Sequence, residues 1–591
     1  MCGIIGYIGN RKAAPIVKKC LEKLEYRGYD SAGIVTYGNP GLKESKTVGS
    51  PQNLLISHMD GDLGIGHTRW ATHGSICRKN AHPHFSCDYK VSIVHNGIIE
   101  NFKELKEDLQ ARDHVFRSET DTEVIAHLIE EQLERKNDLL TAIFETTKSL
   151  EGYYAFVAFS VSEPDTLIAT RKENPLIVGI GVDETFISSD IYAILDHTKS
   201  IVEMNDGEII KVNRDQIALF SPTLESLPIT PTTVNWETET VSLGGYAHYT
   251  LKEIFEQSST LPKTFDQDQA LLQQIADEIA DAELVIFTGM GTSLHAAQNG
   301  REWFLKDWKG KYPPLAIRAA ELPTYKAFLT EETVFIAISQ SGETFDLMSP
   351  LRSLKKELDF PIYSIINKPA SALGRMSTVI PMNAGVEIGV ASTKAYVNTL
   401  GILAQLDMYR RQQNDLSELK ENLTTKIRQV LLWNQFKTTE LAQTLINQKS
   451  VYFIAREGSL PTASEGALKL KEISYLHAEA MSSAELKHGT LALIQKNTPI
   501  IAVSSSNDTA NKQLKDNVIE CLSRGAKVTT VAPKGTKIPY DYLLPIPSYK
   551  TEYEQAILQI VPLQLLAYHT ANLLGCEIDK PRNLAKSVTV G

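Results

Sequence analysis

A repeated order of strand, small-residue turn and helix in the second half of the chain is the feature that most constrains the fold. Leu284–Ala297 (LVIFTGMGTSLHAA) and Thr333–Asp346 (TVFIAISQSGETFD) each run from β-branched residues through a Gly/Ser turn into a helical pattern. This alternation predicts βαβ units and a mainly parallel sheet. Ser450–Ala463 and Thr498–Asn511 resemble the two segments about 165 residues further along. We therefore expect two similar, doubly wound α/β halves.

The N-terminal part has a different pattern, rich in β-strands with helical inserts. Short apolar runs typical of buried strands occupy Gly3–Gly9, Tyr89–Gly97 and Tyr153–Val161. Helical spacing of apolar residues occurs in Ala14–Leu24 and Thr122–Glu134, and Ser221–Tyr246, rich in Pro, Ser, Thr and Gly, marks a boundary. We expect a multidomain α/β chain with an N-terminal domain at 1–235, a linker at 236–260, doubly wound halves at 261–430 and 431–575, and a tail at 576–591.

Composition and charge exclude several classes of protein. The net charge is −11 with a pI near 5.8, so the basic surface of a protein that binds nucleic acid or anionic membrane is missing. Ala556–Leu574 is apolar, but Gln559, Gln564 and His569 would be costly in lipid, so we expect a buried helix there. The N-terminus lacks the features of a signal peptide, and six cysteines do not form a disulfide scaffold in 591 residues. We expect a soluble, cytoplasmic protein.

Cys2 is a candidate nucleophile because of its position. Removal of Met1 would leave a thiol and a free α-amine on one residue, with reference pKa values of about 8.5 and about 7.7–8.0. The amine can accept the thiol proton through a water molecule, and the thiolate can then attack an amide carbonyl. Taken alone, a cysteine at position 2 indicates little, so its meaning depends on the motifs around it.

Five motifs follow Cys2 in the same domain. They are Tyr26–Gly33 (YRGYDSAG), His67–Gly74 (HTRWATHG), Asn80–His84 (NAHPH), His95–Asn101 (HNGIIEN) and Ser118–Val124 (SETDTEV). Together they resemble the class II glutamine amidotransferase domain, an N-terminal-nucleophile (Ntn) hydrolase. That resemblance implies an αββα sandwich that hydrolyses glutamine.

The resemblance implies a role for residues of these motifs. Cys2 would form a glutamyl thioester, with the Asn96 side chain and the Gly97 backbone N–H as its oxyanion hole. Arg69 would pair with the carboxylate of glutamine, a task that suits a bidentate guanidinium. The other implied residues are Asp121 for the α-amino group, Thr72 and His73 for the rest of the pocket, Trp70 as the gate for ammonia, and Arg27 near the N-terminus.

Four potential metal ligands lie close together in the same domain. Cys77, His82, His84 and Cys87 form a C-x4-H-x-H-x2-C pattern, but it lacks the short two-cysteine knuckle of structural zinc sites. We therefore expect no metal. We also expect no flavin, nicotinamide or pyridoxal phosphate, because no motif for these cofactors occurs.

Ile338–Thr344 (ISQSGET) places hydroxyl groups and a glycine at a strand-to-helix turn. With backbone N–H groups, the hydroxyls of Ser339, Ser341 and Thr344 would cradle a phosphate dianion. Plain N-capping is the alternative interpretation, and the Walker pattern of nucleotide triphosphate sites is missing. With the turn Gly291–Ser293, the segment resembles the sugar isomerase (SIS) fold, in which SQSGET binds a phosphosugar. The later copy, SSSNDT, has lost the glycine.

Charged residues gather in Glu465–Gly489 and in the C-terminal tail. Lys469 and Glu472 share a helix face, although an ordinary solvated ion pair is the alternative. His488 precedes a turn glycine, and Lys586 lies in a tail that would by default be frayed. The whole chain nonetheless resembles the glucosamine-6-phosphate synthase family in sequence and domain order. Its few departures, none assigned to chemistry, are Ala247, Thr490 and Gly591.

That family resemblance implies conversion of fructose 6-phosphate and glutamine to glucosamine 6-phosphate and glutamate. His488 would open the sugar ring, and Lys586 would form a Schiff base at the C2 ketone. Glu472 would move a proton between C1 and C2, while Lys469 stabilises the enediol-like charge. The residues implied to bind the sugar phosphate are Ser293, Ser339, Gln340, Ser341, Thr344, Val390, Ser392 and Ala585. Family members associate through their isomerase halves, which implies a homodimer.

Two alternatives belong to other classes. Another class II amidotransferase should carry a pyrophosphate-binding acidic loop, an ATP loop, or flavin and iron–sulfur motifs, and the sequence has none. A non-enzymatic sugar-phosphate sensor should have lost Glu472, His488 or Cys2, and all three are present. We therefore expect an enzyme that passes ammonia directly from glutamine to a sugar phosphate, which avoids its protonation in bulk water.

Overall fold

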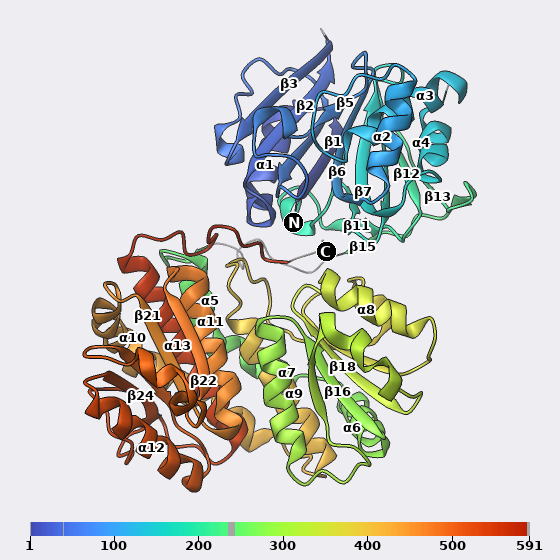
Figure 1. The fold of residues 1–591 in the computed structure, drawn as a ribbon. Helices are drawn as coiled ribbons and strands as arrows, with labels where there is room; N and C mark the ends of the chain where they lie inside the picture. Colours follow the sequence, from blue (N-terminus) through green and yellow to red (C-terminus); the bar gives the residue numbers. More distant parts are fainter. Residues whose placement is uncertain (1, 40, 137, 234–242, 588–591) are drawn as a thin grey trace. The chain divides into compact units, whose positions relative to one another are not determined.

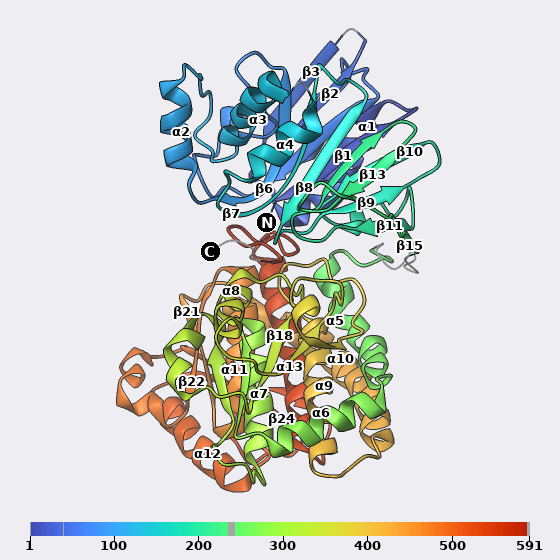
Figure 2. The same ribbon diagram turned by 90° about the vertical axis from the view of Figure 1, so that its right-hand side faces the viewer.

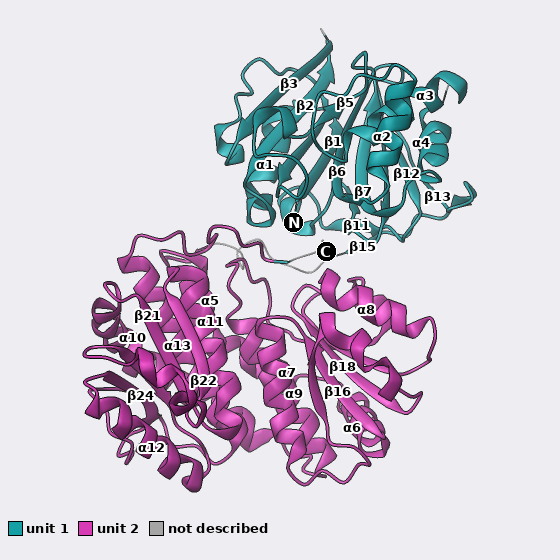
Figure 3. Cartoon of the chain, in the orientation of Figure 1, with its two compact units in different colours: residues 1–242, 587–591 teal, residues 243–586 magenta. Residues whose placement is uncertain are grey.

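The computed structural model describes residues 2–39, 41–136, 138–233 and 243–587 (Figure 1). They form two compact units that divide between residues 242 and 243, with residue 587 counted in the first (Figure 3). Residues 236–242 of the expected linker and 588–591 of the tail lie outside the described residues. The described part of that linker, residues 243–260, is not an extended segment without secondary structure. It contains helix α5 (Tyr249–Thr260), whose Ile254 is fully buried in the core of the second unit.

The first unit contains two antiparallel sheets. The eight-stranded sheet has the order β15 (Thr232–Thr233), β11 (Ser200–Glu203), β9 (Ile177–Ile180), β10 (Glu184–Ser188), β1 (Gly3–Gly9), β4 (Leu63–Arg69), β2 (Ser31–Gly38) and β3 (Gly41–Val48). The seven-stranded sheet has the order β14 (Ser226–Leu227), β13 (Ile217–Phe220), β12 (Ile209–Asn213), β8 (Thr166–Lys172), β7 (Gly152–Ser160), β6 (Val91–Ile99) and β5 (His84–Phe85). The three apolar runs expected to be strands are β1, β6 and β7.

Alternation along β7 shows how this unit is layered. Val157 and Phe159 face the other sheet and pack into the core between the two, whereas Tyr154 and Phe156 face the helices. The helices form the outer layers: α1 (Ala13–Leu24) packs on the eight-stranded sheet, and α2 (Phe102–Ala111), α3 (Glu123–Lys136) and α4 (Leu139–Thr147) lie on the side of the seven-stranded sheet. The unit is therefore the expected αββα sandwich.

The second unit contains two parallel sheets with the same strand order, as the sequence repeat predicts. The first sheet has the order β17 (Leu315–Arg318), β16 (Leu284–Gly289), β18 (Thr333–Ser339), β19 (Ile362–Ile366) and β20 (Thr378–Pro381). The second has the order β22 (His477–Ser482), β21 (Ser450–Ala455), β23 (Pro499–Val503), β24 (Lys527–Pro533) and β25 (Tyr542–Ile546). In each half, the first strand in sequence lies second in the sheet.

Helices cover both sheets and join the halves. They are α6 (Gln269–Asp281), α7 (Thr292–Leu305), α8 (Phe345–Lys355), α9 (Lys394–Arg410), α10 (Ser417–Leu445), α11 (Leu460–Ser474), α12 (Asp508–Ser523) and α13 (Glu552–Leu573). Helix α13 is buried along most of its length and lies beside α11 (Figure 2), which confirms the buried helix expected at Ala556–Leu574. No helix of the described residues is long and apolar enough to span a membrane.

Candidate active sites

A pocket in the first unit gathers residues that are far apart in sequence. It is lined by seven residues of the expected glutaminase site, namely Cys2, Arg69, Trp70, Thr72, His73, Gly97 and Asp121. Sheet register explains part of this convergence, because β1 and β4 are antiparallel neighbours and Gly3 pairs with Thr68. Cys2 is thereby placed beside Arg69, at the end of β4.

Cys2 is held on both its thiol and its carbonyl side. Its Sγ accepts a hydrogen bond from the Trp70 backbone N–H at 3.2 Å. Its carbonyl oxygen accepts hydrogen bonds from Asn96 Nδ2 at 3.0 Å and from Arg27 Nε at 3.2 Å. Burial raises the pKa of the Cys2 thiol, so a base is needed to form the thiolate.

Both residues of the expected oxyanion hole, Asn96 and Gly97, are held in place by neighbouring residues. Asn96 Oδ1 lies 3.0 Å from Nε2 of His67, whose pKa burial lowers to about 3, so the neutral ring can donate this hydrogen bond. Gly97 has φ +131°, and a Cβ atom there would lie 2.1 Å from the carbonyl oxygen of Tyr153. Only glycine fits at this position.

The expected glutamine-binding groups already have partners within the unit. Arg69 donates from Nη2 to the carbonyls of His73 and Gly74 and from Nη1 to that of Ser75. Asp121 Oδ2 accepts the Ile99 N–H at 2.9 Å. A bound glutamine would therefore share these groups with the surrounding backbone.

Four further residues line the pocket: His82, His95, Thr120 and Thr122. They lie within the motifs quoted from the sequence, but none of them was expected in the glutamine pocket. His95 Nδ1 lies 2.9 Å from Thr122 Oγ1, and burial lowers the pKa of His95 to about 4. The pocket wall therefore contains a neutral imidazole.

In the second unit, Lys469 lies at the centre of a buried group between α11 and α7. Its Nζ is 2.6 Å from Glu472 Oε2, 3.3 Å from Glu465 Oε1 and 3.0 Å from Thr292 Oγ1. Glu465 also lies 2.7 Å from His295 Nδ1. Lys469 is only 2% exposed, so the interpretation as a solvated surface ion pair is wrong. Burial favours the neutral amine, but Glu465 and Glu472 outweigh it and raise the pKa of Lys469.

The expected phosphate loop is a tight turn between β18 and α8. Ser339 Oγ lies 2.9 Å from Thr344 Oγ1 and accepts the Gly342 N–H at 3.0 Å. Thr344 occupies the N-cap position, but its side chain does not cap α8. Gly342 has φ +66°, and a Cβ atom there would lie 1.9 Å from Ser371 Oγ. Plain N-capping by Thr344 therefore does not account for this sequence.

The matching turn of the second half is built differently. Asn507 stands in the place of Gly342, and its side chain accepts the N–H groups of Thr509 and Ala510 at the start of α12. In the half that lacks the glycine, N–H groups at the start of the helix are thus already bonded to the Asn507 side chain.

Lys586 is anchored rather than frayed. Its Nζ lies 2.6 Å from Glu387 Oε2 and donates to the Gly389 carbonyl at 2.7 Å. Glu387 also accepts the hydroxyl of Ser392 at 3.1 Å, and the Val390 N–H donates to the carbonyl of Asp579. The tail, Val390 and Ser392 are thereby brought together, and Ala585 adjoins Lys586 in the chain. Sequence reasoning missed Glu387, because no local motif pairs it with a lysine 199 positions away.

Three expected residues are placed less completely. A Cβ atom on Gly289 would lie 2.8 Å from Ser293 Cβ and 3.1 Å from the carbonyl of Ile338, so Ser293 lies beside the strand that leads into the phosphate loop. Gln340 joins that loop to the next strand, because its carbonyl accepts the N–H of Asn367. His488 ends the short 3-10 helix η10 (Glu485–His488) and is exposed, and no contact among the described residues joins it to Lys469 or Glu472.

Family models match both units. The glutamine amidotransferase domain matches residues 52–225, and the SIS domain matches residues 278–407 and 444–574. Over its full length the chain is similar to glutamine–fructose-6-phosphate aminotransferase (isomerizing) from Thermococcus kodakarensis, with 40% identity over 607 residues and 100% of both chains covered. The Aquifex aeolicus protein of the same name is 39% identical over 603 residues, again covering both chains fully.

Solved structures match the second unit. The C-terminal domain of glucosamine-fructose-6-phosphate aminotransferase from Francisella tularensis aligns with a TM-score of 0.53 and 32% identity, over 57% of this chain and 99% of that one. Tagatose-6-phosphate ketose/aldose isomerase from Escherichia coli aligns with a TM-score of 0.51 and 16% identity, over 58% of this chain and 98% of that one. The second likeness concerns the fold alone.

Proposed function

The chain belongs to the glutamine–fructose-6-phosphate aminotransferase (isomerizing) family, and we propose that the two sites described above divide the reaction between them. The enzyme converts fructose 6-phosphate and glutamine to glucosamine 6-phosphate and glutamate. The observation that carries the assignment of residues is the pocket in which Cys2 meets six other expected residues.

The first unit would release ammonia from glutamine. After removal of Met1, the α-amine of Cys2 takes the thiol proton, and Sγ attacks the side-chain amide carbon of glutamine. Asn96 and Gly97 stabilise the oxyanion, ammonia leaves with that proton, and water hydrolyses the thioester to glutamate. Arg69 and Asp121 orient the substrate through its α-carboxylate and α-amine.

The second unit would hold the sugar phosphate and isomerise it. Ser339, Ser341 and Thr344 bind the phosphate beside Ser293 and Gln340, and Lys586 attacks the C2 ketone of the opened sugar. Because Lys586 is paired with Glu387, its ammonium must first lose a proton. Ammonia then replaces the lysine at C2.

The proton transfer between C1 and C2 falls to Glu472. Its carboxylate is partly exposed and bonded to Lys469, which can stabilise the negative charge of the enediol-like intermediate. His488 remains the proposed acid–base for ring opening. Val390, Ser392 and Ala585 would complete the sugar site.

The decisive experiment measures both products with full-length protein. Glutamine and fructose 6-phosphate should give matched amounts of glutamate and glucosamine 6-phosphate. We expect Cys2→Ala to lower both by about a thousandfold or more. Glu472→Gln should lower the amino sugar by about 10²–10⁴-fold and leave glutamine hydrolysis active. Equal loss of both products in Glu472→Gln would contradict this division of work.

We further propose a cytoplasmic homodimer that assembles through the SIS halves, as the family resemblance implies. Light scattering coupled to size-exclusion chromatography tests the dimer, and a monomer at micromolar concentration would contradict it. The domain division is proposed at residues 235, 260, 430 and 575, with helix α5 of the segment 236–260 packed on the second unit.

A further inference from the structure

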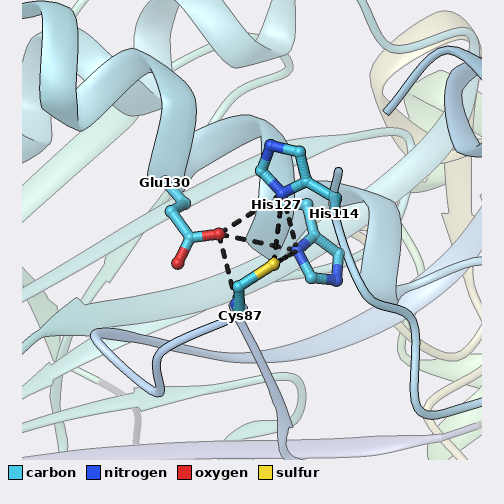
Figure 4. A group of neighbouring side chains, drawn as sticks. All are labelled: Cys87, His114, His127 and Glu130. Atoms are coloured by element: carbon cyan, nitrogen blue, oxygen red, sulfur yellow. Dashed lines mark hydrogen bonds and ion pairs between the residues drawn. The ribbon is translucent and has the colours of Figure 1, made fainter. Parts of the chain in front are cut away.

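A second cluster of chemically reactive side chains lies in the first unit and takes no part in the reaction described above. Cys87 follows β5, His114 follows α2, and His127 and Glu130 lie one turn apart on α3 (Figure 4). Cys87 Sγ, both Nδ1 atoms and a carboxylate oxygen all lie within 4.8 Å of one another. Four groups from three separate segments therefore point at one place.

Five distances within this cluster are close to those of a tetrahedron around a metal ion. Cys87 Sγ lies 3.4 Å from Nδ1 of both histidines, and the two Nδ1 atoms are 3.1 Å apart. Glu130 Oε2 lies 3.4 Å from His114 Nδ1 and 3.6 Å from His127 Nδ1. Zinc bonds of about 2.0–2.3 Å in tetrahedral geometry would place neighbouring ligand atoms about 3.3–3.6 Å apart.

Hydrogen bonds explain only part of this arrangement. Glu130 Oε2 accepts the Cys87 N–H at 3.1 Å and Cys87 Sγ accepts the Val115 N–H at 3.4 Å, but neither bond accounts for the approach of the two ring nitrogens. A proton bridges two atoms, whereas here a sulfur, two ring nitrogens and an oxygen all face one point. Each of these atoms carries a lone pair when deprotonated, and a cation at the centre would satisfy all four together.

A carboxylate lies near the far nitrogen of each ring, at hydrogen-bond distance for His114 and only at ion-pair distance for His127. His114 Nε2 lies 3.3 Å from Glu131 Oε1, which also accepts Arg112 Nε at 2.6 Å. His127 Nε2 lies 3.7 Å from Glu123 Oε1. Carboxylates on the far nitrogen of ligating histidines fix the ring orientation and increase ligand basicity.

We propose that Cys87, His114, His127 and Glu130 bind one Zn²⁺ ion in a closed, structural site. Four protein ligands leave no open position for a substrate, and thiolate with imidazole favours zinc over the oxygen-seeking Ca²⁺ and Mg²⁺. The sequence expectation of no metal is thereby revised. The C-x4-H-x-H-x2-C set itself is not assembled, because Cys77 Sγ lies beside Ser75 Oγ and His84 Nε2 beside Thr120 Oγ1.

The ion would hold in place a segment that forms one wall of the glutamine pocket. The segment between His114 and α3 contains Thr120, Asp121 and Thr122, all of which line that pocket. With His114 and His127 held by one ion, both ends of this segment are fixed. Metal loss is therefore expected to loosen it.

The test measures zinc in full-length protein prepared without chelator or metal-affinity tag. We expect close to one zinc per chain in the wild type and in Cys77→Ser, a matched cysteine control outside the cluster. Cys87→Ser and His114→Ala should hold less than a tenth of that amount. Replacement by Co²⁺ should give tetrahedral ligand-field bands and a thiolate charge-transfer band, both absent in Cys87→Ser.

Two outcomes would overturn the proposal. One is a metal-free wild type that retains no zinc after incubation with excess Zn²⁺ and dialysis. The other is equal zinc loss in Cys77→Ser and Cys87→Ser. His114→Ala also separates binding from folding, because His114 lies in a loop outside the apolar cores. Chelation should lower the melting temperature of the wild type and leave that of a folded His114→Ala unchanged; equal shifts would count against the site.

Discussion

At the residue scale, two glycines allow two effects of adding a side chain to be distinguished: strain in the backbone and steric clash with a neighbour. Gly97 and Gly41 have φ of +131° and +117°. Among the described residues, a Cβ atom on Gly41 would meet nothing within 4 Å, whereas one on Gly97 would meet the Tyr153 carbonyl at 2.1 Å. We expect Gly41→Ala to cost about 1–2 kcal/mol of stability through strain alone and to leave glutamine hydrolysis intact.

Gly97→Ala should cost about 1–3 kcal/mol more, because the backbone must shift to admit the methyl group. The shift would displace an oxyanion donor, so glutaminase kcat should fall about a hundredfold or more. Steady-state kinetics of both variants, with chemical denaturation as the stability measure, checks this. Similar kinetics in the two variants would show that the close approach to Tyr153 is irrelevant to the chemistry.

Sequence motifs located many residues of the candidate sites but not their long-range partners. Cys2, Arg69 and Gly97 lie in or beside recognisable segments, whereas Glu387 is a single acidic residue 199 positions from Lys586. Among the proposed zinc ligands, Cys87 stood out in the sequence, but only with Cys77, His82 and His84. Its partners here are distant in the chain, and only His127 and Glu130 have a helical spacing. Such contacts arise from tertiary packing, which leaves no local periodicity in the chain.

At the scale of elements, helix α5 depends on a residue at the far end of its unit. Asp579 accepts the N–H groups of Tyr249 and Thr250, at 2.8 Å each, and the Thr250 hydroxyl. Because this cap is distant in the chain, no local start signal marks α5, and the sequence pattern of its segment is that of a linker. Strands β1, β6 and β7, in contrast, were predicted because their apolar runs are local.

Loss of that cap should affect the isomerase half alone. We expect Asp579→Ala to cost about 1–2 kcal/mol and to release the tail that carries Lys586. Amino sugar formation should fall about tenfold, while glutamine hydrolysis stays unchanged. Asp579→Asn keeps one acceptor oxygen while its amide nitrogen faces the other backbone N–H, so its loss of amino sugar formation should be intermediate. Parallel product assays would refute this if glutamine hydrolysis fell equally.

The strands that frame the glutamine pocket carry buried neutral histidines, which makes their stability sensitive to pH. Burial lowers the pKa of His67 on β4 to about 3 and that of His95 on β6 to about 4. Below about pH 6.5 the unfolded chain binds protons that the folded unit excludes. Stability is therefore complete above pH 6.5 and declines as the pH falls towards 4, by up to about 1.4 kcal/mol per unit for each histidine.

Hydrogen exchange followed by mass spectrometry can resolve this effect by element. After correction for the intrinsic rate, opening free energies of β4 and β6 should fall between pH 7 and pH 4.5. Strands β16 and β18 contain no histidine and are the internal control. An equal decline in all four strands would assign the effect to general acid destabilisation instead.

At the scale of the whole molecule, none of the described apolar cores extends from one unit into the other. Each cluster of buried residues lies wholly within one unit, and the residues that line the glutamine pocket lie between positions 2 and 122. The repeat of strand order in the second unit follows from the sequence repeat, since each βαβ unit determines its own handedness and neighbours.

Separate cores predict separate activities. We expect a fragment of residues 1–242, with Met1 removed, to fold alone and hydrolyse glutamine within about tenfold of the full chain. Adding residues 243–591 as a second fragment should not restore coupling, because ammonia released into bulk water is diluted and protonated before it reaches the sugar. The ratio of glucosamine 6-phosphate to glutamate should therefore fall from near one in the full chain to a small fraction in the mixture. A folded but inactive first fragment would show that the pocket needs the second unit, and a ratio near one in the mixture would show that covalent linkage is dispensable for transfer.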